Sequence, residues 1–243
     1  MARLRALPAH SPASSAAPLS LPPVTRVTLN DLVYGRLKEA LLAGRIQAGE
    51  VLSLRDLAAQ LSTSVMPVRE AVARLCAENA LRVVPNRGVE VPPLDGETAD
   101  EIWDLRIQLE GRACGLAARR ADAADIARIR STCAAVEAAG KGNEVARLLE
   151  SNSEFQSAIF ASARSPVLLQ MIEILRVKSV PYYAPALDVF VRERPPYWEE
   201  CWANHTEIAE AIAARDADRA RKAKQRDLRA FHAFIKAVNG KKR

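Results

Sequence analysis

The hydrophobic residues at positions 29–41 recur every three or four residues, a spacing that predicts an amphipathic helix. Thr28 stands just before this pattern and Asp31 follows three residues later, the acidic form of a capping box. Gly44 follows the last apolar position and can end a helix in the left-handed conformation. The apolar positions are Leu29, Val33, Leu37, Ala40 and Leu41. The first element that the sequence predicts is therefore a capped helix.

Residues 52–79 show the same spacing in two shorter groups with a polar interruption between them. Ser53 and Ser64 each stand where a hydroxyl can cap a helix, and Pro67 falls in a first turn, where no hydrogen bond is lost. The apolar faces are Leu54, Leu57, Ala58 and Leu61, then Val68, Val72, Leu75 and Cys76. Arg69 leaves the apolar face near the start of the second helix. This pattern predicts a helix-turn-helix that reads a major groove of DNA.

A short hairpin is predicted directly after these helices, because residues 81–91 place apolar and β-branched residues on both sides of a polar turn. A hairpin in this place is a wing, and its tip carries Arg87, which can reach a phosphate or a minor groove. A solvated turn arginine is the alternative, but the position beside two helices favours contact with DNA. Pro92 and Pro93 then mark a boundary, because proline continues neither a central strand nor a helix interior.

From residue 94 to residue 239 the apolar spacing is helical almost throughout. The expected helices are 95–121, one capped by Asp122 and ended by Gly140, one capped by Asn143, one opened by Pro166, one at 197–214 and one capped by Asp216. The first should turn Ile102, Leu105, Leu109 and Leu116 inward. The stretch before residue 197 should be broken by Pro181, Pro185, Pro195 and Pro196. Helices with one apolar face bury it economically in an antiparallel bundle.

The predicted fold class is therefore mainly α, with three parts along the chain. Residues 1–25 are rich in Ala, Pro and Ser and are expected to form a disordered tail. Residues 26–92 form a winged helix-turn-helix with a small β-hairpin. Residues 93–243 form an all-α antiparallel helical bundle.

Composition narrows the class of protein further. The chain is 49% hydrophobic and 26% charged, an ordinary composition for a soluble globular protein. No apolar run approaches the roughly 20 residues that span a bilayer, so no membrane partner is expected. The four cysteines lie far apart without a CxxC pair, which favours reduced thiols in a cytoplasmic protein. The net charge of +6 permits a polyanionic partner. The basic residues near the C-terminus, Lys224 among them, are interpreted as a solvated helix face.

Catalysis has little support in the sequence. The three histidines are His10, His205 and His232, and the first lies in the expected tail. No GxSxG, HExxH or glycine-rich phosphate loop is present, so we expect neither an enzyme nor a cofactor.

The segments SLRDLAAQLSTSVMPVREAVARLCAENAL and RVVPNRGVEV resemble the winged helix of GntR-type bacterial transcription regulators. EIWDLRIQLEGRACGLAA and NHTEIAEAIAARDADRARKAKQRDL are similar to the first and closing helices of the effector-binding domain of the FadR-like subfamily. The resemblance covers residues 27–238. It implies a homodimer that binds a double-stranded operator with two half-sites, represses by family habit, and responds to a small molecule bound in the helical domain.

The resemblance also implies which residues touch DNA. These are Arg55, Ser64, Arg69, Arg87 and Gly88. Their chemistry agrees: Arg69 can donate two hydrogen bonds to a guanine edge, and Arg55 and Ser64 suit phosphate contacts. In the wing, Gly88 allows a close backbone approach. Val65 and Met66 replace the usual arginine and threonine of the family, so a different operator sequence is expected.

Many members of the subfamily hold a divalent metal through one Asp and three His. In this chain the matching positions are Asn152, Gln156, His205 and Asp227. Amide oxygens are weak ligands for zinc or nickel. We therefore expect no bound metal. His205 and Asp227 are the weak alternative ligands, and a metal-dependent regulator of the same family is the less favoured alternative.

The same four positions suit direct recognition of an organic effector, together with Arg106 from the DLRIQLE segment. A guanidinium inside a bundle needs a partner, because an unpaired buried charge is costly, and a carboxylate on the effector supplies one. The expected effector is therefore a small organic acid. Two alternatives stay open: a salt bridge from Arg106 to Asp227 or Glu110 without a ligand, and a DNA-binding dimer that has no effector.

Overall fold

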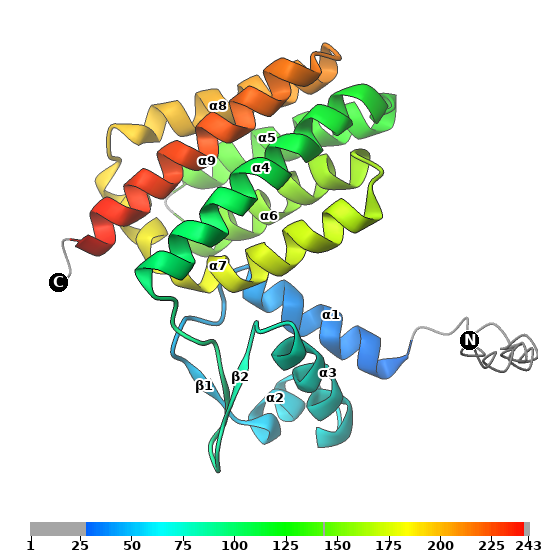
Figure 1. Ribbon diagram of the computed structural model, residues 1–243, viewed down its shortest axis with the longest axis vertical. Coiled ribbons are helices and arrows are strands. Elements are labelled where there is room, and N and C mark those ends of the chain that lie inside the picture. Colours follow the sequence, from blue (N-terminus) through cyan, green and yellow to red (C-terminus); the bar gives the residue numbers. More distant parts are fainter. Residues whose placement is uncertain (1–27, 143, 241–243) are drawn as a thin grey trace, which may run out of the picture.

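The computed structural model describes residues 28–142 and 144–240. It contains a small N-terminal part and a larger helical bundle that lie one above the other (Figure 1). The expected tail at 1–25 and the expected cap Asn143 lie outside the described residues. The division of the chain at residues 92 and 93 falls between the last strand of the first part and the first helix of the second.

The N-terminal part is a winged helix, as predicted. Its helices are α1 (Leu29–Leu42), α2 (Leu54–Gln60) and α3 (Val65–Ala77). Its antiparallel sheet has the strand order β1-β3-β2, with the strands β1 (Val51–Leu52), β2 (Arg82–Val84) and β3 (Gly88–Glu90). The hairpin register pairs Val83 with Val89. The sequence analysis did not predict β1, because two residues are too few to show an alternating pattern.

Local caps start the first two of these helices as expected. The Thr28 side chain accepts a hydrogen bond from the backbone of Asp31, whose carboxylate accepts one in return from Thr28. Ser53 accepts from the backbone N–H of Arg55 at 3.2 Å. Ser64 stands at the N-cap of α3 but makes no side-chain capping bond, so that expectation was wrong. Gly44 follows α1 with φ +63°, as the sequence predicted.

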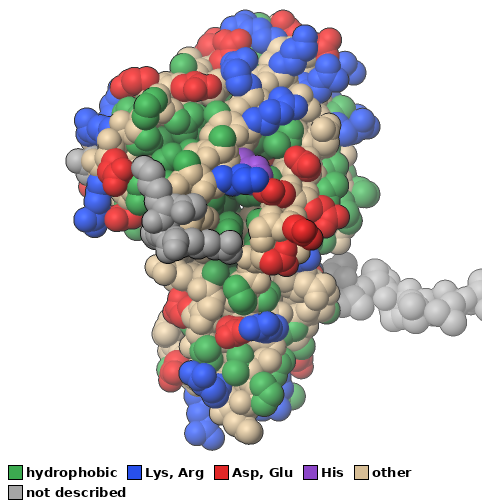
Figure 2. Space-filling view, turned by 60° about the vertical axis from the view of Figure 1, so that its left-hand side comes forward, with side chains coloured by type: hydrophobic (Ala, Val, Ile, Leu, Met, Phe, Trp, Pro, Cys, Tyr) green, Lys and Arg blue, Asp and Glu red, His purple; other side chains and the backbone are tan. Residues whose placement is uncertain are grey.

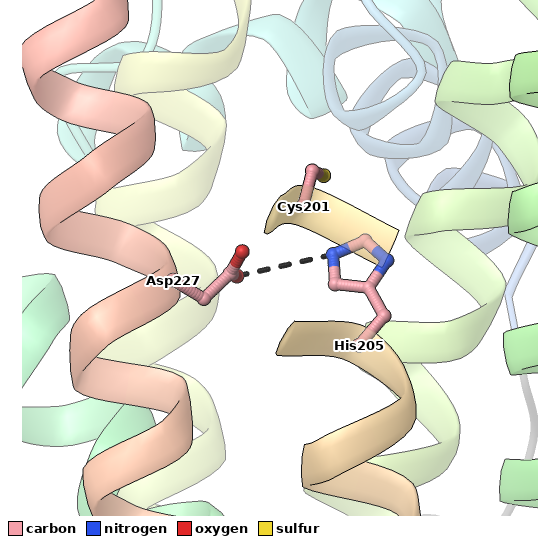
Figure 3. Close-up of side chains that lie close together, drawn as sticks. All are labelled: Cys201, His205 and Asp227. Atoms are coloured by element: carbon pink, nitrogen blue, oxygen red, sulfur yellow. Dashed lines mark ion pairs between the residues drawn. The ribbon is translucent and has the colours of Figure 1, made fainter. Parts of the chain in front are cut away.

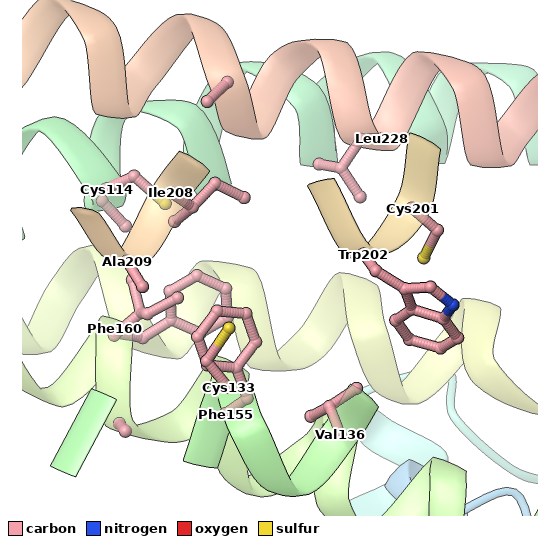
Figure 4. Packing of buried hydrophobic residues seen from close by; sticks show 14 of the residues in the cluster. Cys114, Cys133, Val136, Phe155, Phe160, Cys201, Trp202, Ile208, Ala209 and Leu228 are labelled. Atoms are coloured by element: carbon pink, nitrogen blue, oxygen red, sulfur yellow. The ribbon is translucent and has the colours of Figure 1, made fainter. Parts of the chain in front are cut away.

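The bundle consists of six helices in the described residues. They are α4 (Gly96–Arg120), α5 (Ala123–Lys141), α6 (Val145–Ser162), α7 (Pro166–Glu193), α8 (Tyr197–Ala213) and α9 (Ala217–Gly240). α4 packs along α9, α5 along α6, and α8 along α9. Figure 4 shows the core between them, where the fully buried Phe155, Phe160 and Ile208 lie.

The expected break in α7 and the expected inward position of Leu105 were both wrong. α7 runs unbroken through Pro181 and Pro185, because buried side chains on the same helix, such as Tyr183 and Phe190, hold it in place against the core. Packing here outweighs the lost backbone bonds and the proline ring clashes. Leu105 is 46% exposed, because Ile102 and Arg106 define the inner face of α4 on either side of it.

Gly140 has a different role from the expected one. It lies inside α5, which ends at Lys141 with Gly142 as its C-cap. A Cβ at position 140 would lie 2.4 Å from the ring of Trp202. The glycine therefore allows α8 to approach α5 closely.

α7 also joins the two parts of the molecule. Val177 of α7 is 1% exposed and belongs to the hydrophobic core of the winged helix. Lys38 of α1 forms an ion pair with Glu173 of α7 at 2.6 Å. A Cβ at Gly44 would lie 2.9 Å from the Cβ of Ala184, so the end of α1 packs tightly on α7. Among the described residues, no helix is long and apolar enough to cross a membrane.

Candidate functional site

The candidate DNA-binding surface is the exposed side of the winged helix. Arg55 on α2, Arg69 on α3 and Arg87 in the hairpin turn are all exposed. Figure 2 shows lysine and arginine side chains at the end of the winged helix that lies away from the bundle. Within the described part of the chain, these three guanidinium groups have no acidic partner. They are therefore available for phosphates or base edges.

Neighbouring arginines on the same domain are already paired. Arg74 on α3 lies 3.7 Å from the Tyr34 ring centroid and 3.6 Å from Glu78, and Arg82 on β2 pairs with Glu90. These two arginines are therefore already engaged in contacts within the winged helix. The contrast separates the arginines that are paired within the winged helix from those that face solvent without an acidic partner in the part of the chain that the structure describes.

Gly88 and Ser64 complete the expected DNA-contacting set. Ser64 is exposed at the start of α3, near the surface that the arginines define. Gly88 has φ +130°, and a Cβ there would lie 2.1 Å from the Leu52 carbonyl oxygen. The glycine thus has a structural role that the sequence did not reveal, because β1 passes directly against the hairpin. Contact of either residue with DNA stays a prediction.

The second candidate site is a buried cavity of about 60 Å³ in the bundle. All five residues expected to bind an effector line it, although they come from four helices. They are Arg106 on α4, Asn152 and Gln156 on α6, His205 on α8 and Asp227 on α9. The lining also includes polar or charged residues that the sequence analysis did not assign to the pocket, among them Arg176, Lys224, Tyr183, Tyr197 and Cys201.

Arg106 is paired inside the bundle. Its Nε donates to Glu110 Oε1 at 2.8 Å, and its Nη1 donates to the Ser179 hydroxyl at 3.1 Å. Its guanidinium lies 4.3 Å from the Trp103 ring centroid. Burial alone lowers the pKa of Arg106, but the Glu110 carboxylate outweighs it and the pKa is raised overall. Of the two salt bridges that the sequence left open, the one to Glu110 is therefore formed.

Lys224 contradicts the interpretation of the C-terminal basic residues as a solvated face. It is 1% exposed, and its Nζ donates to Gln156 Oε1 at 2.9 Å. The ammonium also lies 3.2 Å from Glu110 Oε2 and 3.6 Å from Asp227 Oδ2. A sequence signal existed, because Lys224 lies four residues after the buried Ala220 and four before the buried Leu228.

Three potential metal ligands meet beside this ammonium. Cys201 and His205 project from α8 towards Asp227 on α9, and their ligand atoms lie within 4.8 Å of one another (Figure 3). The sequence analysis did not assign Cys201, although it lies one turn before His205 on the same face of α8. The positive charge of Lys224 stands beside Asp227, where it opposes a divalent cation. The three ligand atoms of Cys201, His205 and Asp227 therefore fit a resident metal poorly. That the protein functions without a metal stays a prediction.

Burial of His205 favours its neutral form at this site. Burial lowers its pKa most strongly, and the nearby Lys224 lowers it further, while Asp227 at 3.8 Å acts in the opposite direction. Its Nδ1 is buried without a hydrogen-bond partner among the described residues. Asp227 accepts a hydrogen bond at 2.9 Å from the Tyr197 hydroxyl. The pocket thus combines charged, amide and neutral imidazole groups in a small enclosed space.

The fold and these two sites define a winged-helix DNA-binding protein with a charged pocket in its helical domain. Residues 29–91 match the bacterial regulatory proteins of the gntR family, and residues 101–230 match the FCD domain. The chain belongs to the GntR family of bacterial transcription regulators, in the group that carries an FCD domain. It is therefore a DNA-binding regulator, which confirms the choice of a regulator over an enzyme.

Characterised proteins agree with this assignment. The HTH-type transcriptional regulator McbR of Escherichia coli is 34% identical over 155 residues, covering 64% of this chain and 70% of that protein. The HTH-type transcriptional repressor GlaR of E. coli is 29% identical over 198 residues, covering 77% and 86%. The solved structure of E. coli McbR/YncC matches with a TM-score of 0.79 and 28% identity, covering 88% of this chain and all of that one.

Proposed function

We propose that this regulator is a homodimeric repressor that binds a two-half-site operator and releases it when a small organic acid enters the bundle pocket. The observation that carries the proposal is the pocket itself. Five residues expected from the sequence to bind an effector line one buried cavity, and α7 joins that cavity to the winged helix. GlaR, which is named a repressor, supports the direction of regulation.

DNA recognition is assigned to α3 and the wing. Arg69 enters the major groove and reads a guanine, Arg55 and Ser64 contact phosphates, and Arg87 at the wing tip reaches the adjacent backbone or minor groove. Two copies of α3 in a dimer must match the spacing of two half-sites. A change in the relative placement of the two winged helices therefore weakens simultaneous docking.

Effector recognition is assigned to the pocket. The amides of Asn152 and Gln156 both donate and accept hydrogen bonds, and the neutral imidazole of His205, which burial favours, can also do both. A carboxylate is the ligand group that best suits a pocket rich in cations. The effector acts by shifting the population of dimer conformations, because it binds one of them more tightly than the other.

A DNA-binding dimer without an effector is the second candidate. The ion pairs of Arg106 with Glu110 and of Lys224 with Glu110 favour it, since these two cations already have partners. A bundle that serves only for dimerisation would need no ligand to complete these pairs.

Two experiments on the full chain separate the candidates. Selection of bound duplexes from a random pool, at a stated salt concentration, gives the operator and shows whether it has two half-sites. Thermal unfolding with a panel of carboxylic acids then tests the effector. A ligand at 100 times its dissociation constant stabilises the folded state by about 2.7 kcal/mol. Stabilisation together with operator release supports the proposal, and a panel without any effect supports the second candidate.

A further inference from the structure

Arg176 on α7 is the charged residue of the pocket that lacks a partner. It is 3% exposed and lines the cavity. Within the described residues its guanidinium makes no hydrogen bond or ion pair, and its Nε is buried and unpartnered. Its guanidinium carbon lies 5.7 Å from the centroid of the Phe160 ring. A buried guanidinium without an acceptor is costly, so the site favours an anion that supplies one.

The charges in and beside the cavity leave one positive charge without compensation. The cations Arg106, Arg176 and Lys224 and the anion Asp227 line the cavity, and Glu110 lies buried beside it, paired with Arg106 and Lys224. Burial lowers the pKa of His205, which favours its neutral form. Three positive charges against two negative charges give an excess of one. Burial lowers the pKa of Arg176, whereas the pKa of Arg106 is raised beside its carboxylate partner. The same type of side chain is thus satisfied at one position and unsatisfied at the other.

We propose that Arg176 binds the carboxylate of a small, singly charged organic acid and that the turn of α7 carrying Arg176 transmits this binding to the winged helix. The inference rests on the proposed function, because it specifies the effector of the same pocket. It assigns the effector carboxylate to Arg176, which has no partner among the described residues, and not to Arg106, which is already paired with Glu110. A single negative charge neutralises the excess.

The shape and lining of the cavity define the rest of the ligand. A volume of about 60 Å³ admits a few heavy atoms without rearrangement. Apolar side chains, Leu148, Leu187, Phe190 and Phe231, form much of the wall. The ligand is therefore a short monocarboxylate with an apolar body, since a second carboxylate would meet these walls and the charges of Glu110 and Asp227.

The route to the winged helix lies in a single turn of α7. Val177, the next residue after Arg176, is 1% exposed in the core of the winged helix. Glu173, one turn earlier, pairs with Lys38 of α1 at 2.6 Å. An anion that draws Arg176 into the cavity therefore acts on the same turn that supports α1.

The first test measures anion binding by thermal unfolding of the full chain at constant salt. The probes are acetate, propionate, butyrate and benzoate, with propionamide as the neutral analogue and malonate as the dianion. We expect a monocarboxylate to raise the melting temperature, propionamide to have no effect, and malonate to act more weakly. No shift with the four monocarboxylates, or an equal shift with propionamide, overturns the proposal. A shift with chloride that matches the carboxylates also overturns it, because it identifies an inorganic anion site.

The decisive variant is Arg176→Met, with Arg192→Met on the same helix as the matched control. Arg192 is exposed and pairs with Asp188. Arg176→Met should raise the melting temperature of the free protein, because it removes an unpaired buried charge, and should weaken monocarboxylate binding about tenfold to hundredfold. Arg192→Met should change neither property markedly. Unaltered binding by a folded Arg176→Met variant overturns the assignment.

The coupling is tested with Glu173→Gln and the operator obtained by selection. This variant should bind the monocarboxylate as wild type does but should release the operator less completely. Unchanged release overturns the proposed route. If the wild type selects no operator, the proposed function fails, whereas the thermal shifts still decide whether Arg176 binds an anion.

Discussion

The winged helix and the bundle pocket use charged side chains in opposite ways. Arg55, Arg69 and Arg87 have no acidic partner but face water, which solvates them at little cost. Arg106 and Lys224 lie inside the bundle, where each ion is held by a carboxylate. An unpaired arginine on the surface therefore does not by itself indicate a ligand. The unpaired and buried Arg176 does, because an unpaired charge inside the bundle is costly.

The largest effect should come from Glu110, which lies between Arg106 and Lys224. Glu110→Gln leaves these buried cations without their shared anion, so we expect a loss of about 3–5 kcal/mol in the free energy of unfolding. Urea denaturation measures it. Glu154→Gln on the exposed side of α6 is the control and should change stability little. A Glu110 variant as stable as wild type would show that the pocket charges do not depend on this carboxylate.

Acidification should affect the pocket through the same residue. Burial raises the pKa of Glu110, but the charges of Arg106, Lys224 and Arg176 outweigh it and lower the pKa from 4.5 to about 2. The unfolded chain therefore takes up this proton near pH 4.5 while the folded chain does not. The free energy of unfolding should fall as the pH drops from about 4.5 towards 2. Glu110→Gln should have a shallower dependence in that interval, and equal slopes would contradict this.

Gly88 tests the structural side of the winged helix. Gly88→Ala places a Cβ against the Leu52 carbonyl at a φ of +130°, so we expect a loss of about 1–3 kcal/mol in stability. Differential scanning calorimetry of the variant and the wild type measures it. Gly35→Ala on α1, where a Cβ meets nothing within 4 Å, is the control and should be neutral or stabilising. If both variants melt alike, the close passage of β1 has no energetic importance.

Arg69 should show the reverse behaviour, with a small effect on stability and a clear effect on binding. Arg69→Ala should leave the free energy of unfolding within about 0.5 kcal/mol of wild type. It should lose specific operator binding, since a bidentate contact with guanine provides about 1–3 kcal/mol of discrimination per subunit. Fluorescence anisotropy with operator and scrambled duplexes measures this. Equal preference for the operator in variant and wild type would remove Arg69 from base recognition.

The difference between the two regions also explains what the sequence could predict. The winged helix depends on local signals, such as the Thr28 cap and the turn around Gly88, so its helices and hairpin were predicted correctly. The unbroken course of α7 was not predicted. Pro181 and Pro185 locally favour the end of a helix, and here tertiary packing outweighs that preference.

The pocket was predicted in part for a similar reason. The five expected effector residues do line one cavity. They could be named from the sequence because the family resemblance indicated their positions. Lys224 was hidden among other basic residues. Arg176 was not recognised, although it lies four residues from both Ile172 and Val180 and so shares their buried face. Which cation lacks a partner depends on distances between α4, α7 and α9, and these distances exist only in the folded chain.

The most direct test of the account measures operator affinity with and without propionate or a related monocarboxylate, in the wild type and in Arg176→Met. The account predicts that the acid weakens operator binding by the wild type and leaves the variant unchanged, while both bind the operator equally without acid. Operator affinity that no monocarboxylate alters, or that falls equally in both proteins, would contradict the claim that the buried pocket controls the DNA-binding surface.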